Sequence, residues 1–243
     1  LEIRLKRLKE GHPSVAASYK NLGDVYNAKG DYDEAKENYK NSLEIQMKTL
    51  GEEHTDVAGS YDCLGDVDYN QGNYPKALQY YEKSLKTYLK TLDPEHSLLA
   101  TVYNNLASVY RNLGENNKAM EYHERALKIR LKTLDSEHCD VATSYNNIGN
   151  VYKAQGDNDK AIINYEKAMA IYTKNLGEEH PWVATSYSNL GAAYSNQHYY
   201  DKALEYYETA LALYSETLGA EHPDTIKTQE WADYLRNKNE KNN

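Results

Sequence analysis

Apolar side chains recur with helical spacing in two stretches of residues 138–179. Within 140–155, and again within 159–175, they stand every third or fourth residue, the period of one helix face. These positions are Val141, Ala142, Tyr145, Ile148, Gly149, Val151 and Tyr152, then Ala161, Ile162, Tyr165, Ala168, Met169 and Tyr172. Gly156 lies between the stretches, where helices commonly end with a residue of positive φ. The pattern predicts a helical hairpin.

This hairpin is one copy of a unit that fills the chain. Six histidines stand 42 residues apart without an insertion, namely His12, His54, His96, His138, His180 and His222. A helix pair of this kind has an apolar face too wide to bury alone, and stacking against neighbouring pairs covers it. We therefore predict an all-α solenoid, a single domain over residues 1–243. Its full repeats are 12–53, 54–95, 96–137, 138–179 and 180–221.

Partial repeats are expected at both ends. Residues 1–11 align with 43–53, the last half of a second helix, so the chain is expected to start inside a repeat and to dock this segment on repeat one. Residues 222–243 are expected to form a single capping helix with a polar tail, because arrays of this type need a solvating end.

A few positions depart from the repeat. Asp68 stands where other repeats have Tyr26, Tyr110, Tyr152 and Tyr194. His123 occupies an aromatic position and is expected in the core. His198 replaces a turn glycine, and we expect it to take a positive φ, which histidine tolerates better than most residues. Pro75 falls in the first turn of a helix, where proline is accepted.

The repeated residues match a known pattern. Tyr145, Ile148, Gly149 and Tyr152, followed by Ala161 and Tyr165, follow W-x-x-L-G-x-x-Y…A-x-x-x-F with tyrosine in the Trp and Phe positions. The match holds in five repeats in one register, so the chain resembles the tetratricopeptide repeat family over essentially its whole length. The long unit resembles that of kinesin light chains. The resemblance implies a right-handed superhelix whose first helices line a concave groove.

The composition limits the classes of partner that this chain is expected to bind. A net charge of −9 and a pI of about 5.4 argue against nucleic acid. No apolar run approaches the roughly 18 residues of a membrane span, and no signal segment opens the chain, so a cytoplasmic location is expected. Cys63 and Cys139 lie in different repeats without disulfide or zinc spacing. The 25 tyrosines accompany no phenylalanine, and a buried tyrosine hydroxyl needs a partner.

Catalysis and metal binding find little support. The six repeat histidines belong to successive units that stack about 10 Å apart or more, too far to share an ion whose ligands lie at about 2 Å. We expect them in loops or at helix starts. The chain has no G-x-x-x-x-G-K-[ST], H-E-x-x-H or G-x-S-x-G motif. We therefore predict no enzyme, no metal and no cofactor.

The candidate site is a polar stripe on the first helix of each repeat. Its members lie on one helix face, at i, i+3, i+4, i+7, i+10 and i+11. The predicted peptide-binding residues are Asn21, Asn104, Asn105, Ser108, Arg111, Asn112, Asn146, Asn147, Asn150, Lys153 and Asn189. A side-chain amide carries both a donor and an acceptor, so a row of asparagines can pair with the backbone of an extended peptide whatever its sequence. The corresponding asparagines of kinesin light chains hold cargo peptides, which implies an adaptor.

Charge along this stripe is uneven. Asp24, Asp62 and Asp66 mark repeats one and two, whereas Arg111 and Lys153 mark repeats three and four. We hypothesise that opposed charges orient a bound peptide. A clamp for a C-terminal carboxylate, another use of this groove in the family, is disfavoured because Asp24 would repel the carboxylate.

Other interpretations stay open. The chain could be a structural scaffold that associates head to tail, because each end carries an unpaired part of a repeat. It could also be an excised or designed array without a specific ligand, or a sensor domain from a larger protein.

Overall fold

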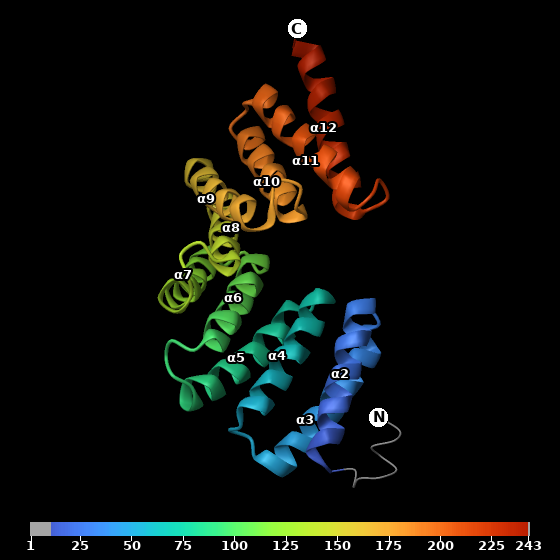
Figure 1. Ribbon diagram of the computed structural model, residues 1–243, viewed down its shortest axis with the longest axis vertical. Coiled ribbons are helices and arrows are strands. Elements are labelled where there is room, and N and C mark those ends of the chain that lie inside the picture. The colour runs from blue at the N-terminus through green and yellow to red at the C-terminus, as the bar shows by residue number, and fades with distance from the viewer. Residues whose placement is uncertain (1–10, 243) are drawn as a thin grey trace. The chain divides into compact units, whose positions relative to one another are not determined.

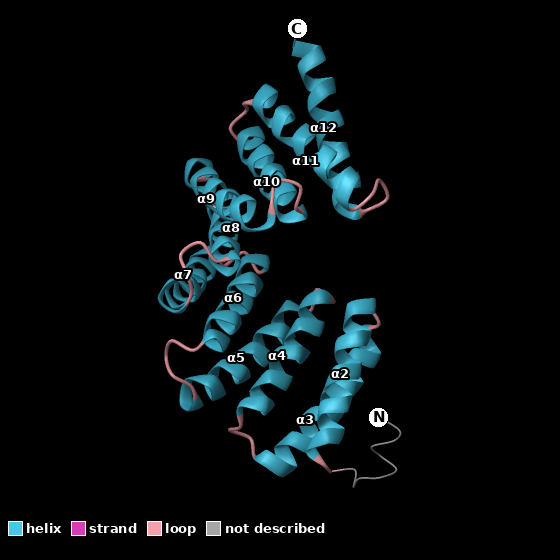
Figure 2. Ribbon diagram, viewed as in Figure 1, coloured by secondary structure: helices cyan, strands magenta, loops and turns pink. Residues whose placement is uncertain are grey.

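The computed structural model describes residues 11–242, with side chains to residue 239, and every regular element in that range is a helix (Figure 2). Five helix pairs and one further helix follow along the chain (Figure 1). They are α2 (Pro13–Lys29) and α3 (Tyr32–Leu50), α4 (Thr55–Asn70) and α5 (Tyr74–Thr91), α6 (Ser97–Asn112) and α7 (Asn116–Thr133), α8 (Cys139–Ala154) and α9 (Asn158–Leu176), α10 (Pro181–Asn196) and α11 (Tyr200–Thr217), then α12 (Pro223–Asn242).

These bounds agree with the predicted hairpins. In repeat four, α8 and α9 begin and end within one residue of the expected ranges 140–155 and 159–175. Pro75 lies in the first turn of α5, as expected. The half helix expected at residues 1–11 falls outside the described residues except for Gly11. The apolar period therefore predicted the helices correctly throughout the described range.

The repeat histidines cap the first helix of every repeat. The Nδ1 atom of His12 accepts a hydrogen bond from the backbone N–H of Ser14 at 3.1 Å, and His138 accepts from Asp140 at 3.1 Å. His54, His96, His180 and His222 do the same. An acceptor at this position satisfies one of the backbone N–H groups that a helix start leaves unpaired. The expectation of a role at helix starts is thus confirmed.

The turns inside the hairpins need a left-handed residue. Gly156 has φ of 84°, and Gly30, Gly72 and Gly114 are similar. In repeat five this position belongs to His198, which is the one non-glycine residue of positive φ among the described residues, at 66°. Both expectations for this turn are confirmed. Because a Cβ atom is strained in this conformation, His198 holds it at a cost that the glycines avoid.

The described chain divides into two compact units. Unit 1 ends at Ile129 and contains α2 to α6 and most of α7, and unit 2 begins at Arg130 and contains the last turn of α7 and α8 to α12. Within each unit, the two helices of a complete pair pack on each other, and the second helix of one repeat also packs on the first helix of the next. Stacking of helix pairs in this way is the arrangement of an α-solenoid.

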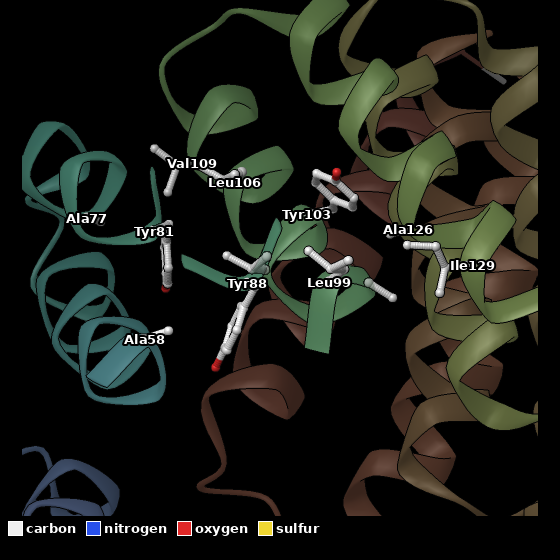
Figure 3. Close-up of a cluster of buried hydrophobic side chains, with 12 residues drawn as sticks. Ala58, Ala77, Tyr81, Tyr88, Leu99, Tyr103, Leu106, Val109, Ala126 and Ile129 are labelled. Carbon is white, nitrogen blue, oxygen red and sulfur yellow. The ribbon is translucent and has the colours of Figure 1, made fainter. Parts of the chain in front are cut away.

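The core lies between the helices of consecutive repeats. In unit 1, the rings of Tyr81 and Tyr88 on α5 belong to one cluster with Leu99 and Leu106 of α6 (Figure 3). Small side chains allow the helices to approach, and Ala58, Ala77 and Ala126 belong to the same cluster. His123 is 1% exposed and occupies the expected core position.

Repeat two replaces an apolar contact by an ion pair. Asp68 is fully buried, and the Nζ atom of Lys36 on α3 lies 2.5 Å from its Oδ1 atom. Between repeats four and five, the same two positions hold Ile162 and Tyr194, which pack in one apolar cluster. The irregular Asp68 is therefore explained by its partner on the preceding repeat, because a carboxylate buried without a cation would be strongly unfavourable.

Candidate functional site

The predicted stripe lies at the surface of both units. Among its eleven residues, Asn21 and Asn112 are exposed and the others are half-buried. The first helices of consecutive repeats contact each other, α2 with α4 and α8 with α10. Each unit thus has its own stretch of the stripe, running over neighbouring helices.

Hydrogen bonds join the stripe from one repeat to the next. In unit 1, the Nδ2 atom of Asn105 donates to Asp66 at 3.4 Å, and Asn112 donates to the hydroxyl of Tyr69 at 2.9 Å. In unit 2, Asn189 donates to the Oδ1 atom of Asn146 at 2.9 Å. The asparagines are therefore held in place by their neighbours, and a ligand would add to this network or rearrange it.

Tyrosine hydroxyls reach the stripe from the second helices. Tyr39 donates to Asp24 at 2.8 Å and Tyr165 donates to Asn150 at 2.8 Å. Tyr81 likewise donates to Asp66 at 2.6 Å. The rings are buried while their hydroxyls end at polar stripe residues. This arrangement gives a structural reason for tyrosine where the family pattern has phenylalanine.

The stripe of unit 1 is acidic, with Asp24 exposed and Asp62 and Asp66 half-buried. Burial raises the pKa of Asp62 to about 7 and also raises the pKa of Asp66. The neighbouring Cys63 thiol has its pKa raised by burial to about 12 and is therefore protonated at neutral pH. Lys20 is the nearby cation, and its Nζ atom lies 3.2 Å from Asp24.

A hollow of about 410 Å³ opens on the stripe of unit 2. Lys153 of α8 and Asn189, Ala192 and Ser195 of α10 line one part of it. Thr185, Ser188 and Asn196 of α10 also line it, and the opposite wall combines two tyrosines of α11 with the first half of α12, namely Tyr207, Tyr214, Asp224, Lys227, Thr228 and Trp231. The hollow therefore brings together two of the predicted site residues, Lys153 and Asn189, with aromatic and basic groups.

A second hollow, of about 360 Å³, lies in unit 1. Small residues open it, because Ala17 and Gly59 stand where repeats three to five have threonine. Tyr88, Leu50 and Leu98 give it an apolar lining, and Lys20 and Asp56 lie at its wall.

Several residues of the unit 2 hollow were absent from the sequence prediction. Tyr207 and Tyr214 come from α11, a second helix, and Trp231 comes from α12. Trp231 stacks on Tyr207 with ring centroids 6.3 Å apart. Repeat register offered a signal for Trp231, because it stands 42 residues after Asn189 and so continues the stripe. No comparable signal identified the tyrosines, because their pattern indicates core positions.

No group of three or more His, Cys, Asp or Glu side chains within residues 11–239 is arranged to hold a metal ion. None of the helices in the described range combines the length and apolar character needed to cross a membrane.

These features define an α-helical repeat protein of the class that serves as a scaffold for protein interactions. The chain belongs to the tetratricopeptide repeat family. One family model with that description matches residues 1–48, 14–62, 56–132 and 140–199, and a second one matches residues 183–224. The resemblance noted from the sequence is thereby confirmed. None of the curated proteins matches the sequence.

Solved structures extend the likeness to kinesin light chains. A Podosopora anserina protein described as a kinesin light chain with nearly identical TPR-like repeats is 30% identical, with a TM-score of 0.71 over 85% of this chain and 98% of that one. BtubC (BKLC) of P. vanneervenii is 27% identical, with a TM-score of 0.73 over 87% of this chain and 84% of that one. The Cut9-Hcn1 structure is 17% identical with a TM-score of 0.67 and shares the fold alone.

Proposed function

We propose that this chain binds an extended peptide segment of a partner protein along the stripe of its first helices. The hollow of unit 2 carries the proposal. The hollow is open to solvent and lies on the stripe, and its lining combines polar side chains with aromatic ones. Peptide sites commonly combine a few directed polar groups with apolar lining in this way. The kinesin-light-chain likeness supports the same use.

The asparagine pair Asn146 and Asn189 has chemistry suited to this role. Each amide has both a donor and an acceptor, and the bond between them uses only one of each. The remaining groups can pair with a peptide backbone. Lys153 lies on the wall of the same hollow, with its Nζ atom 5.9 Å from the centroid of the Tyr165 ring. We expect it to favour acidic residues in the ligand, and we place basic ligand residues near Asp62 and Asp66 of unit 1.

The experiment is a selection of short random peptides displayed on phage. The parent chain is compared with Asn147→Ala/Asn189→Ala, which changes the stripe. Asn38→Ala/Asn164→Ala is the matched control, because these half-buried amides on second helices donate to carbonyls of their own helix. We expect the parent and the control to enrich one motif that the stripe variant loses while its helicity is unchanged. Equal enrichment by all three would place the site elsewhere, and no enrichment would contradict the proposal.

The head-to-tail alternative meets an obstacle on α12. A second helix packs on a first helix where a tyrosine ring covers a glycine such as Gly191. At this register α12 has Asp233, and it has Arg236 where α10 has Tyr194. Arg236 is paired with Glu208 at 2.8 Å and with Asp233 at 2.7 Å. These charges weigh against docking of another second helix there.

A further inference from the structure

The tyrosine hydroxyls of the repeats have a regular partner. In repeats one, two and four, the tyrosine donates to a stripe residue located 15 positions earlier in the chain. The acceptors are Asp24, Asp66 and Asn150, two carboxylates and one amide. The protein thus supplies its own oxygen atom at this place in three repeats.

Repeat five has the tyrosine without the acceptor. Its ring, Tyr207, is 3% exposed and stacks on Trp231. The residue 15 positions earlier is Ala192, whose methyl group cannot accept a hydrogen bond. Ala192 packs in the same cluster as Tyr207, and over residues 11–239 the Tyr207 hydroxyl has no hydrogen-bond partner. Burial raises the pKa of Tyr207 above its usual value, so the hydroxyl remains a donor at neutral pH.

The missing acceptor coincides with the hollow. Both Ala192 and Tyr207 line it, so the space that an Asp or Asn side chain fills in other repeats is here open to a ligand. The surrounding charges are Lys153, Lys227 and Asp224. The Tyr207 hydroxyl borders this open hollow and is not enclosed in the core, so an acceptor on a bound ligand would take the place of water as its hydrogen-bond partner.

We propose that the Tyr207 hydroxyl donates a hydrogen bond to the ligand. The bound peptide then supplies the oxygen acceptor that Asp24, Asp66 and Asn150 supply in the other repeats. The inference rests on the proposed peptide-binding function and deepens it. The ligand is a peptide segment with one side-chain oxygen acceptor at the position facing Ala192. That oxygen belongs either to a carboxylate, as in repeats one and two, or to an amide, as in repeat four. The two lysines in the wall give the carboxylate the larger expected effect.

The test uses peptides selected on the parent chain and two changes in repeat five. Tyr207→Phe removes the donor and retains the ring. Ala192→Asn installs the acceptor of repeat four, which should bond to Tyr207 and fill the space. Tyr39→Phe is the matched control, because that hydroxyl already donates to Asp24. The affinity of each peptide is measured by fluorescence anisotropy, first with its selected sequence. An Asp at the acceptor position is then replaced by Asn and by Leu, and an Asn at that position is replaced by Asp and by Leu.

We expect one ligand position at which replacement by Leu weakens binding to the parent chain about tenfold. The same replacement should not weaken binding to the Tyr207→Phe variant any further. Ala192→Asn should weaken binding similarly while raising the melting temperature, and Tyr39→Phe should leave affinity unchanged. The comparison of Asp with Asn at that position distinguishes a carboxylate from an amide.

Additive losses for the ligand change and Tyr207→Phe would overturn the inference, as would unchanged binding by Ala192→Asn. If peptides are selected and the stripe variant loses them while both repeat-five variants keep them, the proposed function stands and only this inference fails. If no peptide is selected, both are contradicted.

Discussion

The ring of Tyr165 lies against the backbone of Gly149 so closely that a Cβ atom on Gly149 would stand 2.7 Å from the Cε1 atom of the ring. The same contact joins Gly23 to Tyr39 and Gly65 to Tyr81. Repeat three is the exception, and it changes both partners, to Ala107 and His123. An imidazole is shorter than a phenol, so the added methyl group has room. The two positions are therefore coupled within each hairpin.

This coupling predicts that Gly149→Ala destabilises the chain by about 1–3 kcal/mol, because the buried ring must shift. Adding Tyr165→His, which reproduces the pair of repeat three, should recover part of that loss. Urea denaturation of the two single variants and the double variant measures the coupling energy. Strictly additive effects would show that ring size and the missing Cβ are independent.

The buried pair of Lys36 and Asp68 leads to a second prediction. Lys36→Met should destabilise the chain by about 3–5 kcal/mol, because Asp68 is then a buried carboxylate without a cation. Lys36→Leu/Asp68→Tyr restores an apolar pair of the kind seen at Ile162 and Tyr194, and should equal or exceed the parent in stability. Chemical denaturation compares the variants. Lys20→Met is the control, since the Lys20–Asp24 pair is exposed and should contribute less than about 1 kcal/mol. Equal losses for the two lysine variants would contradict this account.

Asp62 predicts an unusual pH dependence. Its pKa rises from 3.8 to about 7 on folding, so between these values the folded state binds the proton more tightly than the unfolded state. The free energy of unfolding should therefore fall as pH rises from about 4 to 7, by up to about 4 kcal/mol. Asp62→Asn should remove this contribution, raising stability at pH 8 and leaving it nearly unchanged near pH 3.5. Thermal melts across this range provide the measurement, with the exposed Asp33→Asn as the control. An equal gain in stability from Asp62→Asn at pH 3.5 and at pH 8 would contradict the raised pKa of Asp62.

His198 predicts a local gain in stability. Its φ of 66° strains a residue that has a Cβ atom, so His198→Gly should stabilise the chain. The gain is reduced by loss of the hydrogen bond between His198 Nδ1 and the Tyr200 hydroxyl, at 2.7 Å. We expect a net gain of about 0.5–1 kcal/mol. The reverse change in repeat four, Gly156→His, should cost about 1–2 kcal/mol. Calorimetry measures the stability of both variants, and the prediction requires that His198→Gly raise it and Gly156→His lower it.

Sequence periodicity was sufficient for the helices within the described range and for the family. Apolar spacing determines which face of a helix must be covered, and five copies in one register leave little freedom in how that face is covered. Single residues that differ from the repeat pattern also predicted structure correctly where the cause is local. The positive φ of His198 and the buried position of His123 both follow from the residue that the other repeats have at the same place.

Tertiary contacts decided what the candidate site contains. The stripe asparagines were visible in the sequence, but their bonds to neighbouring repeats depend on how closely the first helices approach. The partnership of Lys36 with Asp68 joins residues on different repeats, and neither residue alone indicates it.

The hollow of unit 2 shows the same division most clearly. The chain's pattern determined that Tyr207 is a core aromatic and that Ala192 belongs to the stripe. Only packing places the two together at an open space beside Trp231 and Lys153. Periodicity specifies the direction of a side chain from its own helix, whereas a binding site depends on distances between side chains of different helices, and those distances are set by how the helices pack.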